Sequence, residues 1–445
     1  MDKLVSLSKR RGFIFQGSEI YGGLGAIWDY GPLGVELKNN IKAEWWRANV
    51  QERDDVVGID AAILMHPRTW EASGHIESFY DRLIDCKGCK RRFRAEEVDK
   101  RCPVCGGELT EPRTFNLMFK TFVGPVEEEA MPVYLRPETA QGIFVNFSNV
   151  LTTMRKKLPF GIAQIGKAFR NEITTGNFIL RTREFEQMEI EYFVKPEDSN
   201  YWFERWIEER FGWYVGIGLK EENLRTRFHG KDELAHYALA CCDIEYKFPI
   251  GWAAIEEVVI RGDFDLICHI DYSGERLTLL EEEKREHIFP YVIEPSSGVD
   301  RIFLALMADA YDEDVVEGER RVVLRFLPKM APIKAAVLPL LRREPLIKLA
   351  RDIYARLRKR WMVQYDEVQS IGRRYRRQDE IGTPFCVTID PGSLEDNMVT
   401  IRERDTTKQM RVPIDILEDV LERKIKGEPF DILPEGGRWH YLGEG

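Results

Sequence analysis

Four cysteines in two close pairs place the strongest single constraint on how this chain can fold. Cys86 and Cys89 are separated by two residues, and after twelve intervening residues Cys102 and Cys105 repeat that spacing. Four thiolates at this spacing suit one tetrahedral metal ion and leave it no open coordination position. The pattern predicts a structural zinc site that folds a compact insertion over residues 81–113. Two redox-active pairs or free thiols are the less favoured alternative.

The composition is that of a globular protein with room for several domains. Of the 445 residues, 44% are hydrophobic and 11% aromatic, which supplies ample apolar surface for folded cores. The formal net charge is -10, so a nucleic-acid partner would need a local basic surface. The sequence contains no apolar stretch of about 18 residues. We therefore expect a cytoplasmic protein with no membrane partner.

Alternating side chains over residues 183–191 indicate a strand whose two faces differ. Because successive strand residues point to opposite faces, Phe185, Gln187 and Glu189 share one face. In the preceding strand pattern, residues 162–170, small residues and a terminal arginine share one face. We interpret this pair of strands as the floor of a ligand-binding site.

Three segments resemble the three motifs of class II aminoacyl-tRNA synthetases, in the order of that family. The helix expected after Pro32 resembles motif 1, residues 169–172 with 183–185 resemble motif 2, and residues 298–301 resemble motif 3. Within this class the chain most resembles the homodimeric glycyl enzymes. Four segments carry this closer resemblance: residues 22–34, 136–142, 185–189 and 294–298.

This resemblance implies a multidomain fold with an α+β part and an α/β part. Residues 1–330 are expected to form a class II catalytic domain, with a mainly antiparallel sheet flanked by helices and the zinc-ribbon insertion. After residue 330 strand and helix patterns alternate, which favours a separate α/β domain. By resemblance, residues 331–425 form an anticodon-binding domain, residues 426–445 form a C-terminal extension, and motif 1 forms a homodimer.

The resemblance also implies a reaction: ATP-dependent activation of glycine to glycyl-adenylate, followed by transfer to tRNA(Gly). In the first step a carboxylate attacks the α-phosphate of ATP, so positive charge must lie where negative charge develops. By similarity Arg170 bridges the glycine carboxylate and the α-phosphate, and Arg301 holds the γ-phosphate. Phe185 stacks on adenine and Glu172 accepts a hydrogen bond from its exocyclic amine. The catalytic set is Arg170, Glu172 and Arg301.

Motifs 2 and 3 imply a longer set of nucleotide contacts. The expected ATP-binding residues are Arg170, Asn171, Glu172, Leu180, Arg181, Thr182, Arg183, Glu184, Phe185, Gly298, Val299, Asp300 and Arg301.

Glycine offers no side chain to grip, so its recognition must use the ammonium group and exclude a β-carbon. Glu138, Glu189 and Ser297 match the family positions that bind the ammonium, and Arg94 matches a substrate-contacting position in the zinc insertion. The expected glycine-binding residues are Arg94, Glu138, Phe185, Glu186, Gln187, Met188, Glu189, Glu294, Pro295, Ser296, Ser297 and Gly298.

Magnesium is expected to accompany ATP in this family. The chain has Ala254 where the family typically has a glutamate of the ATP and magnesium site, which leaves Glu294 and Glu256 as acidic ligand candidates, with Glu294 preferred. His269 beside Cys268 is interpreted as a structural pair rather than a second metal site.

A basic segment in the third region is the candidate tRNA contact. Arg373, Arg374, Arg376 and Arg377 flank an aromatic residue, and Arg402, Arg404 and Lys408 lie on a nearby hairpin. Basic and aromatic side chains together suit phosphate contacts and stacking on unpaired bases. A charged run is more often a solvated helix face, but the resemblance to class IIa anticodon-binding domains favours RNA.

Two other functions remain open. A class II synthetase for another amino acid, such as alanine, serine or threonine, would keep the motifs with a reshaped pocket. A non-catalytic RNA- or DNA-binding relative would keep the fold. The presence of Arg170, Glu172 and Arg301 argues against this second function, and Ala254 argues for it.

Overall fold

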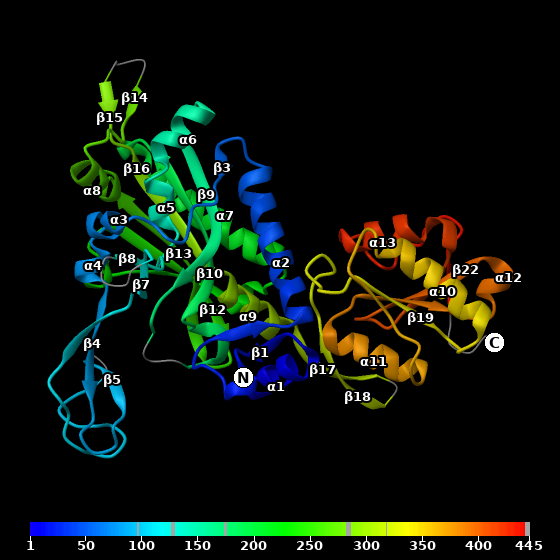
Figure 1. Cartoon of the computed structure of the whole chain (residues 1–445). Coiled ribbons are helices and arrows are strands. Elements are labelled where there is room, and N and C mark those ends of the chain that lie inside the picture. The colour runs from blue at the N-terminus through cyan, green and yellow to red at the C-terminus, as the bar shows by residue number, and fades with distance from the viewer. Residues whose placement is uncertain (96–97, 126–129, 173–175, 282–285, 317, 441–445) are drawn as a thin grey trace.

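The computed structural model consists of a larger N-terminal region and a smaller C-terminal region that lie side by side (Figure 1). It describes all residues except 96–97, 126–129, 173–175, 282–285, 317 and 441–445. The predicted insertion and the predicted C-terminal extension therefore lie partly outside the described residues. None of the described helices combines the length and hydropathy needed to cross a bilayer.

A seven-stranded sheet forms the centre of the N-terminal region. Its order is β11 (Leu224–Phe228), β12 (Ala240–Phe248), β13 (Gly251–Gly262), β16 (Tyr291–Gly298), β10 (Glu184–Val194), β9 (Phe160–Phe169) and β3 (Val56–Gly58). Every neighbouring pair is antiparallel except β3 with β9, which is parallel. The expectation of a mainly antiparallel sheet is confirmed.

One face of this sheet is buried under three helices, α2 (Pro32–Trp46), α7 (Ser199–Gly216) and α9 (Val299–Ala310). Leu37, Ile41 and Trp45 of α2 pack in one core with Met188 and Ile190 of β10. Pro32 lies in the first turn of α2, where its missing N–H leaves no hydrogen bond unmade. Gly34 is required there because a Cβ would lie 1.9 Å from the Phe13 carbonyl oxygen.

Short elements surround the sheet and carry the insertion. They are α1 (Asp2–Arg11), β1 (Ile14–Gln16), β2 (Trp28–Tyr30), α3 (Pro67–Ala72), α4 (His75–Ser78), β7 (Lys120–Val123), β8 (Met131–Tyr134), α5 (Ala140–Phe144), α6 (Phe147–Met154), α8 (Phe264–Ser273), β14 (Leu279–Glu281) and β15 (Glu286–Ile288). The insertion itself is a three-stranded sheet of β5 (Arg92–Arg94), β4 (Tyr80–Asp85) and β6 (Arg113–Asn116). Figure 1 shows it extending away from the central sheet.

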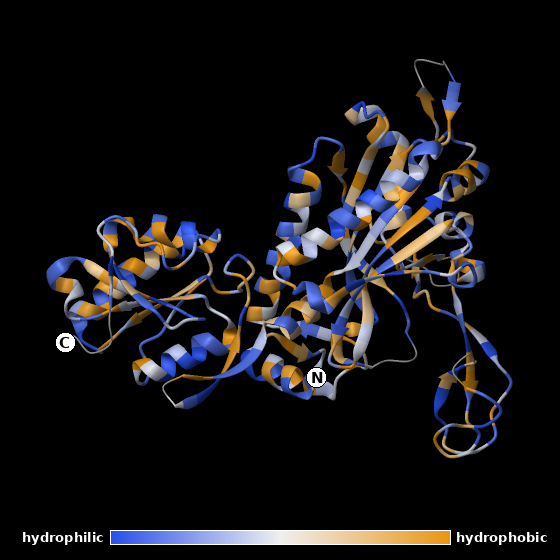
Figure 2. Cartoon of the chain, turned by 180° about the vertical axis from the view of Figure 1, so that it is seen from behind, coloured by the Kyte–Doolittle hydropathy of each residue, from blue (hydrophilic) through white to orange (hydrophobic). Residues whose placement is uncertain are grey.

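The C-terminal region is a second sheet with helices on it, as the alternating pattern predicts. The strands follow the order β20 (Val363–Tyr365), β19 (Ala335–Pro339), β21 (Phe385–Ile389), β22 (Met398–Glu403), β23 (Gln409–Pro413) and β24 (Arg438–Trp439). The helices are α10 (Glu344–Leu357), α11 (Ile371–Ile381), α12 (Ser393–Asp396) and α13 (Leu417–Ile425). The tail, expected to be loop or extension, adds the edge strand β24 to this sheet. Figure 2 shows apolar residues along the strands of both sheets.

A hairpin, β17 (Tyr311–Val316) and β18 (Glu319–Leu324), joins the two regions. Arg321 of this hairpin donates to Asp379 of α11 at 2.9 Å, and Arg402 donates to the same carboxylate at 2.9 Å. Arg404 donates to the carbonyl oxygen of Phe326 at 2.8 Å. Because all three arginines and Asp379 are buried, the regions are fixed to one another through charged hydrogen bonds.

Candidate active site

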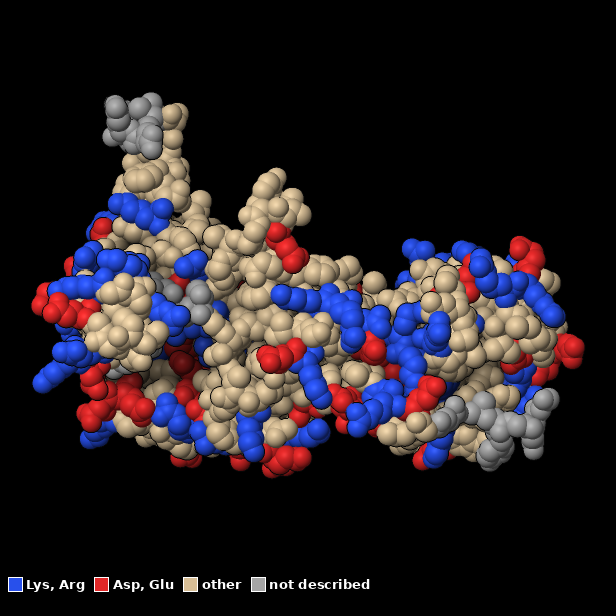
Figure 3. Space-filling view, turned by 90° about the horizontal axis from the view of Figure 1, so that it is seen from below, with Lys and Arg blue, Asp and Glu red and all other residues tan. Residues whose placement is uncertain are grey.

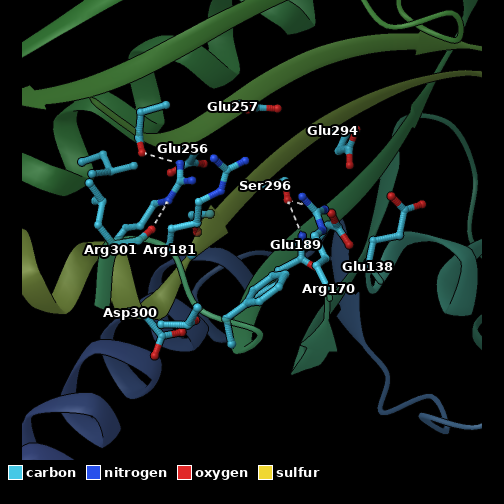
Figure 4. A pocket seen from close by; sticks show the side chains of 18 of the residues that line it. Glu138, Arg170, Arg181, Glu189, Glu256, Glu257, Glu294, Ser296, Asp300 and Arg301 are labelled. Carbon is cyan, nitrogen blue, oxygen red and sulfur yellow. Dashed lines mark hydrogen bonds between the residues drawn. The ribbon is translucent and has the colours of Figure 1, made fainter. Parts of the chain in front are cut away.

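A cavity opens on the face of the central sheet opposite the three helices (Figure 4). Strand alternation accounts for this, since Met188 and Ile190 pack in the core while Gln187 and Glu189 line the cavity. The expected site residues that line it are Glu138, Arg170, Glu172, Leu180, Arg181, Thr182, Phe185, Gln187, Glu189, Glu294, Ser296, Ser297, Gly298, Asp300 and Arg301. Motifs 2 and 3, far apart in the sequence, thus meet in one cavity.

Arg170 directly follows β9 and lies over aromatic rings. Its Nε donates to the carbonyl oxygen of Pro137 at 3.0 Å. Its guanidinium lies 5.4 Å from the ring centroid of Phe185 and 5.5 Å from that of Phe79. Because only Nε is used by that hydrogen bond, the outer edge of the guanidinium can bind an anion.

Arg301 extends from the first turn of α9 into the same cavity. Its Nη1 donates to the carbonyl oxygen of Ala254 at 2.7 Å, and its Nε lies 3.3 Å from that of Leu180. Burial lowers the pKa of Arg301, and the nearby cations Arg170 and Arg181 lower it further, while Glu257 opposes them. An arginine keeps its charge under these conditions, so the guanidiniums of Arg301 and Arg181 concentrate positive charge at this end of the cavity, while Arg170 lies beside Glu189 and Glu138 (Figure 4).

Glu172 connects the zinc insertion to the cavity. Its Oε2 lies 3.0 Å from Nε of Arg181 and 3.6 Å from Nη2 of Arg94, a residue of β5. Arg94 is also 2.9 Å from Asp81. Arg94 therefore does not line the cavity itself but reaches a residue that does.

The other end of the cavity is acidic. Ser296 donates its hydroxyl to Glu189 at 2.7 Å, and the Thr139 hydroxyl donates to the second oxygen of Glu189. Glu138 accepts from Gln141 at 3.1 Å and faces His75 at 3.4 Å. Burial works to raise the pKa of Glu138, but His75, Arg261 and Gln141 together hold it well below its usual range. Glu138 is therefore ionised at neutral pH.

Ser296, rather than Ser297, faces these carboxylates. The Ser297 hydroxyl donates to the carbonyl oxygen of Met188 at 3.2 Å. Gln187 lies 3.4 Å from the Ser296 hydroxyl, which places Ser296 within the acidic group. The two serines differ because they are adjacent on β16 and point to opposite faces.

Several expected site residues lie outside the cavity lining: Arg94, Asn171, Arg183, Glu184, Glu186, Met188, Pro295 and Val299. Glu186 instead faces α2, with carboxylate oxygens 3.0 Å from both Lys38 and Lys42. Arg183 donates to the carbonyl oxygens of Gly25 and Glu172 at 3.0 Å. These side chains support the motif 2 loop and strand from behind.

Residues that no motif marks complete the lining: Ile179, Tyr237, Ala254, Ile255, Glu256, Glu257 and Val259. The Tyr237 ring centroid lies 4.1 Å from the Arg261 guanidinium, which itself lies 3.0 Å from Glu294. The sequence offers no local signal for Tyr237, because its neighbours in the cavity come from other strands.

The acidic candidates for magnesium differ in what they contact. Glu256 is buried and accepts from Arg210 at 2.7 Å and from the Tyr214 hydroxyl at 2.6 Å, so its carboxylate is already satisfied within the core. Glu256 also lines the cavity and stays a candidate, although its carboxylate already serves these two donors. Glu294, which accepts from Arg261 at 3.0 Å, and the exposed Glu257 line the cavity as well, and both have the carboxylate oxygens that magnesium prefers as ligands.

The four cysteines of the insertion converge as their spacing predicts. Their Sγ atoms all lie within 4.8 Å of one another, with Cys86 to Cys105 at 3.4 Å and Cys89 to Cys102 at 3.7 Å. A zinc ion with bonds of about 2.3 Å needs roughly this separation between sulfurs. A hydrogen bond from the Cys89 backbone N–H lowers the pKa of Cys86 to about 6, which favours the thiolate. The cluster fits a structural zinc ion.

Half of the arginines expected to contact tRNA are buried: Arg374, Arg402 and Arg404. Arg374 donates to the carbonyl oxygens of Pro339 and Leu340 at 2.7 and 3.2 Å, so it holds α11 on its sheet. Arg373 is exposed, and Arg376 and Arg377 are partly exposed. Figure 3 shows Lys and Arg side chains gathered where the two regions meet and over the C-terminal region.

Comparison with known proteins agrees with this arrangement. Residues 121–310 match the tRNA synthetase class II core domain (G, H, P, S and T), and residues 334–424 match an anticodon binding domain. A prolyl-tRNA synthetase structure from Cryptosporidium parvum, complexed with L-proline and AMP, shares the fold, with a TM-score of 0.64 at 14% identity over 95% of this chain and 77% of that one.

Curated relatives match almost the full length of the chain. The glycine–tRNA ligase of Thermobifida fusca is 52% identical, with 96% of this chain and 98% of that protein covered. The glycine–tRNA ligase of Geobacillus kaustophilus is 54% identical, with 96% and 99% covered. The chain therefore belongs to the glycine–tRNA ligase family of class II aminoacyl-tRNA synthetases.

Proposed function

We propose that this chain activates glycine with ATP to glycyl-adenylate and transfers the glycyl group to tRNA(Gly), the reaction for which its relatives are named. One observation carries the proposal: a single cavity has the guanidiniums of Arg181 and Arg301 at one end, the carboxylates of Glu138 and Glu189 at the other, and Arg170 beside those carboxylates (Figure 4). The positive end suits the triphosphate of ATP, and the carboxylates suit the ammonium group of glycine.

Arg170 is proposed to act on the reacting atoms. The glycine carboxylate oxygen attacks the α-phosphorus, the bond from that phosphorus to the bridging oxygen breaks, and pyrophosphate leaves. No general base is needed, because the carboxylate is ionised at neutral pH. The free edge of the Arg170 guanidinium neutralises charge on both groups. Arg301 binds the γ-phosphate, and Phe185, beneath Arg170, stacks on adenine.

Glu138, Glu189 and Ser296 are proposed to hold the glycine ammonium. Two carboxylates desolvated together bind a cation strongly, and the Ser296 hydroxyl orients Glu189 through the 2.7 Å hydrogen bond. The ammonium contact expected of Ser297 is assigned to Ser296 instead, because the Ser296 hydroxyl faces Glu189 and the Ser297 hydroxyl does not. Amino acids larger than glycine are proposed to be excluded because the pocket has no room for their β-carbon.

The metals have separate proposed roles. Zinc, bound by Cys86, Cys89, Cys102 and Cys105, folds a ribbon within residues 81–113. Magnesium screens the charge of the ATP phosphates when bound, with Glu294 and Glu257 as the candidate ligands. We also propose that residues 1–330 form the catalytic domain, residues 331–425 the anticodon-binding domain and residues 426–445 a C-terminal extension.

A homodimer is supported by an exposed apolar group next to motif 1. Ile20, Tyr21 and Leu24 are 88%, 87% and 53% exposed, and Val35 at the start of α2 is also exposed. Apolar side chains gathered on a surface mark interaction sites more often than isolated ones do. We propose that a second copy of the chain covers this group.

Exchange of labelled pyrophosphate into ATP tests the activity and the role of Arg170. We expect exchange that depends on glycine and is much weaker with alanine, serine or threonine. Arg170→Ala should lower the rate by about a hundredfold or more with unchanged thermal unfolding. Lys167→Ala, on the strand that Arg170 directly follows and with an exposed side chain, is the control and should retain activity.

The outcomes separate the three candidate functions. Preferential exchange with another amino acid would support a synthetase of that specificity. A folded protein that binds tRNA but catalyses exchange with none of these amino acids would support the non-catalytic relative. Substantial residual exchange in Arg170→Ala would contradict the role assigned to that side chain.

A further inference from the structure

A second group of metal-ligand side chains lies near the β11 edge of the central sheet, in the described part of the chain. His229 follows β11, and Cys241 and Asp243 share one face of β12. One ligand atom from each, an imidazole nitrogen, a thiol sulfur and a carboxylate oxygen, lies within 4.8 Å of the other two. This group shares no residue with the cysteine cluster of the insertion, and the function proposed above does not use it.

Asp243 is the most constrained member of the group. It is 4% exposed, and its Oδ1 is buried without a hydrogen-bond partner. Its Oδ2 lies 2.8 Å from Nε2 of His229. A buried carboxylate oxygen with no donor is costly, so this oxygen remains available for a ligand that supplies positive charge.

One cation, Arg227, already approaches the group. Its Nη2 lies 3.3 Å from Asp243 Oδ2 and 3.2 Å from His229 Nε2. Arg227 also contacts Glu233 at 2.9 Å and Glu245 at 3.5 Å. Since its side chain is partly exposed and keeps these two acidic partners, it can leave Asp243 without becoming unpaired.

We propose that His229, Cys241 and Asp243 form a second metal site that binds a divalent cation of the zinc class. Thiolate, imidazole and carboxylate are together the ligands that zinc prefers, and small side-chain rotations suffice to bring three atoms this close to bonding distance of roughly 2.0–2.3 Å. Three protein ligands leave one coordination position open, unlike the four cysteines of the insertion.

Binding requires the Cys241 thiol to lose its proton. Burial raises the pKa of this thiol, and the nearby carboxylates of Glu257 and Asp243 raise it further. A sulfur–metal bond therefore forms as the S–H bond breaks and the proton goes to solvent, with no oxidation. The doubly charged ion also neutralises the acidic surroundings that disfavour a bare thiolate.

The site adjoins the catalytic cavity. Asp243 pairs across the sheet with Glu257, and Cys241 pairs with Val259. Both partners on β13 line the cavity. A metal ion bound here is therefore separated from the cavity by one strand.

Cobalt provides a spectroscopic test of the site. Purified chain is first freed of metal, given one equivalent of zinc per chain for the cysteine cluster, and then titrated with Co²⁺. We expect one equivalent to bind with tetrahedral visible bands and a sulfur-to-cobalt charge-transfer band. Cys241→Ser should abolish that band. Cys242→Ala, a change at the adjacent residue on the opposite face of β12, should retain it.

Two measurements keep the test decisive. Released zinc is monitored during the titration, so that replacement of zinc at the cysteine cluster by cobalt is detected. If Cys241→Ser folds poorly by circular dichroism, His229→Gln at the sheet edge replaces it and should weaken cobalt binding at least tenfold. The proposal is overturned if wild type binds no additional cobalt, or if a folded Cys241→Ser or His229→Gln binds it as wild type does.

Discussion

Two buried carboxyls in the N-terminal region differ because different donors face them. Glu138 is held by His75 and Gln141, whereas both oxygens of the fully buried Glu191 lack a hydrogen-bond partner. Burial raises the pKa of Glu191 well above its usual range, and Glu294 and Glu189 add to this against the opposing charge of Arg261. Glu191 is therefore neutral over a wide range of pH.

This difference predicts opposite effects of amide substitution. A pKa raised in the folded state gives stability that is present below the unfolded value, about 4.3, and is lost as pH rises. Glu191→Gln should therefore gain stability relative to wild type from pH 5 to pH 8, by at most about 1.4 kcal/mol per pH unit. Denaturant unfolding at both pH values measures this. Glu138→Gln, at a carboxyl with a lowered pKa, should instead destabilise the folded protein at pH 8. An equal effect of Glu191→Gln on the free energy of unfolding at both pH values would contradict the argument.

The sequence alone predicted many of the residues that line the cavity. Strand alternation explains the residues that were predicted wrongly. The face of Phe185, Gln187 and Glu189 was predicted and lines the cavity. Glu186 and Ser297 were taken from contiguous motifs, although Glu186 faces α2 and the Ser297 hydroxyl donates to the Met188 backbone at the border of the cavity. Arg374 and Arg402 could not be recognised as buried, because their partners Pro339 and Asp379 lie elsewhere in the chain.

Among the elements, the insertion depends most on something outside its own sequence. Few of its apolar side chains are buried, chiefly Leu83 and Ile84 beside the cysteines, so its strands lack a core large enough to fold alone. A strong chelator should loosen residues 81–113 before the central sheet. Hydrogen exchange followed by mass spectrometry measures the order, and metal analysis of untreated protein provides the control. Uniform exchange after chelation, or no metal at the start, would contradict a zinc-dependent fold.

Long elements were predictable, whereas two very short edge strands were not. The helix after Pro32 and the strands around residues 162–170 and 183–191 all follow their residue patterns. Strands β3 and β24 have only three and two residues, too few to show an alternating pattern, and they form because a neighbouring strand edge accepts them.

At the scale of the whole molecule, Asp379 is central to how the regions are joined. Replacing it with alanine leaves the buried Arg321 and Arg402 without their shared carboxylate, which should cost about 3–5 kcal/mol. Asp379→Ala should lower the thermal unfolding temperature and increase the radius measured by small-angle scattering. Asp352→Ala, at an exposed position of α10, should change neither, and unchanged scattering in Asp379→Ala would show that other contacts suffice.

The proposed dimer is also a property of the whole molecule. Tyr21→Glu places a charge within the exposed apolar group of Ile20, Tyr21 and Leu24, and should shift the protein to monomer in light scattering. Tyr201→Glu, a change at an exposed tyrosine on α7, is the matched control. A wild-type monomer at micromolar concentration would argue against the dimer.

The buried arginines between the hairpin and α11 have one further consequence. A joint made of desolvated ion pairs cannot bend freely, so the separation between the catalytic cavity and the C-terminal sheet is set by the protein before any RNA arrives. A tRNA that contacts the catalytic cavity and the C-terminal sheet at once must have a length and curvature that fit this separation. The fixed separation therefore selects tRNA by its shape.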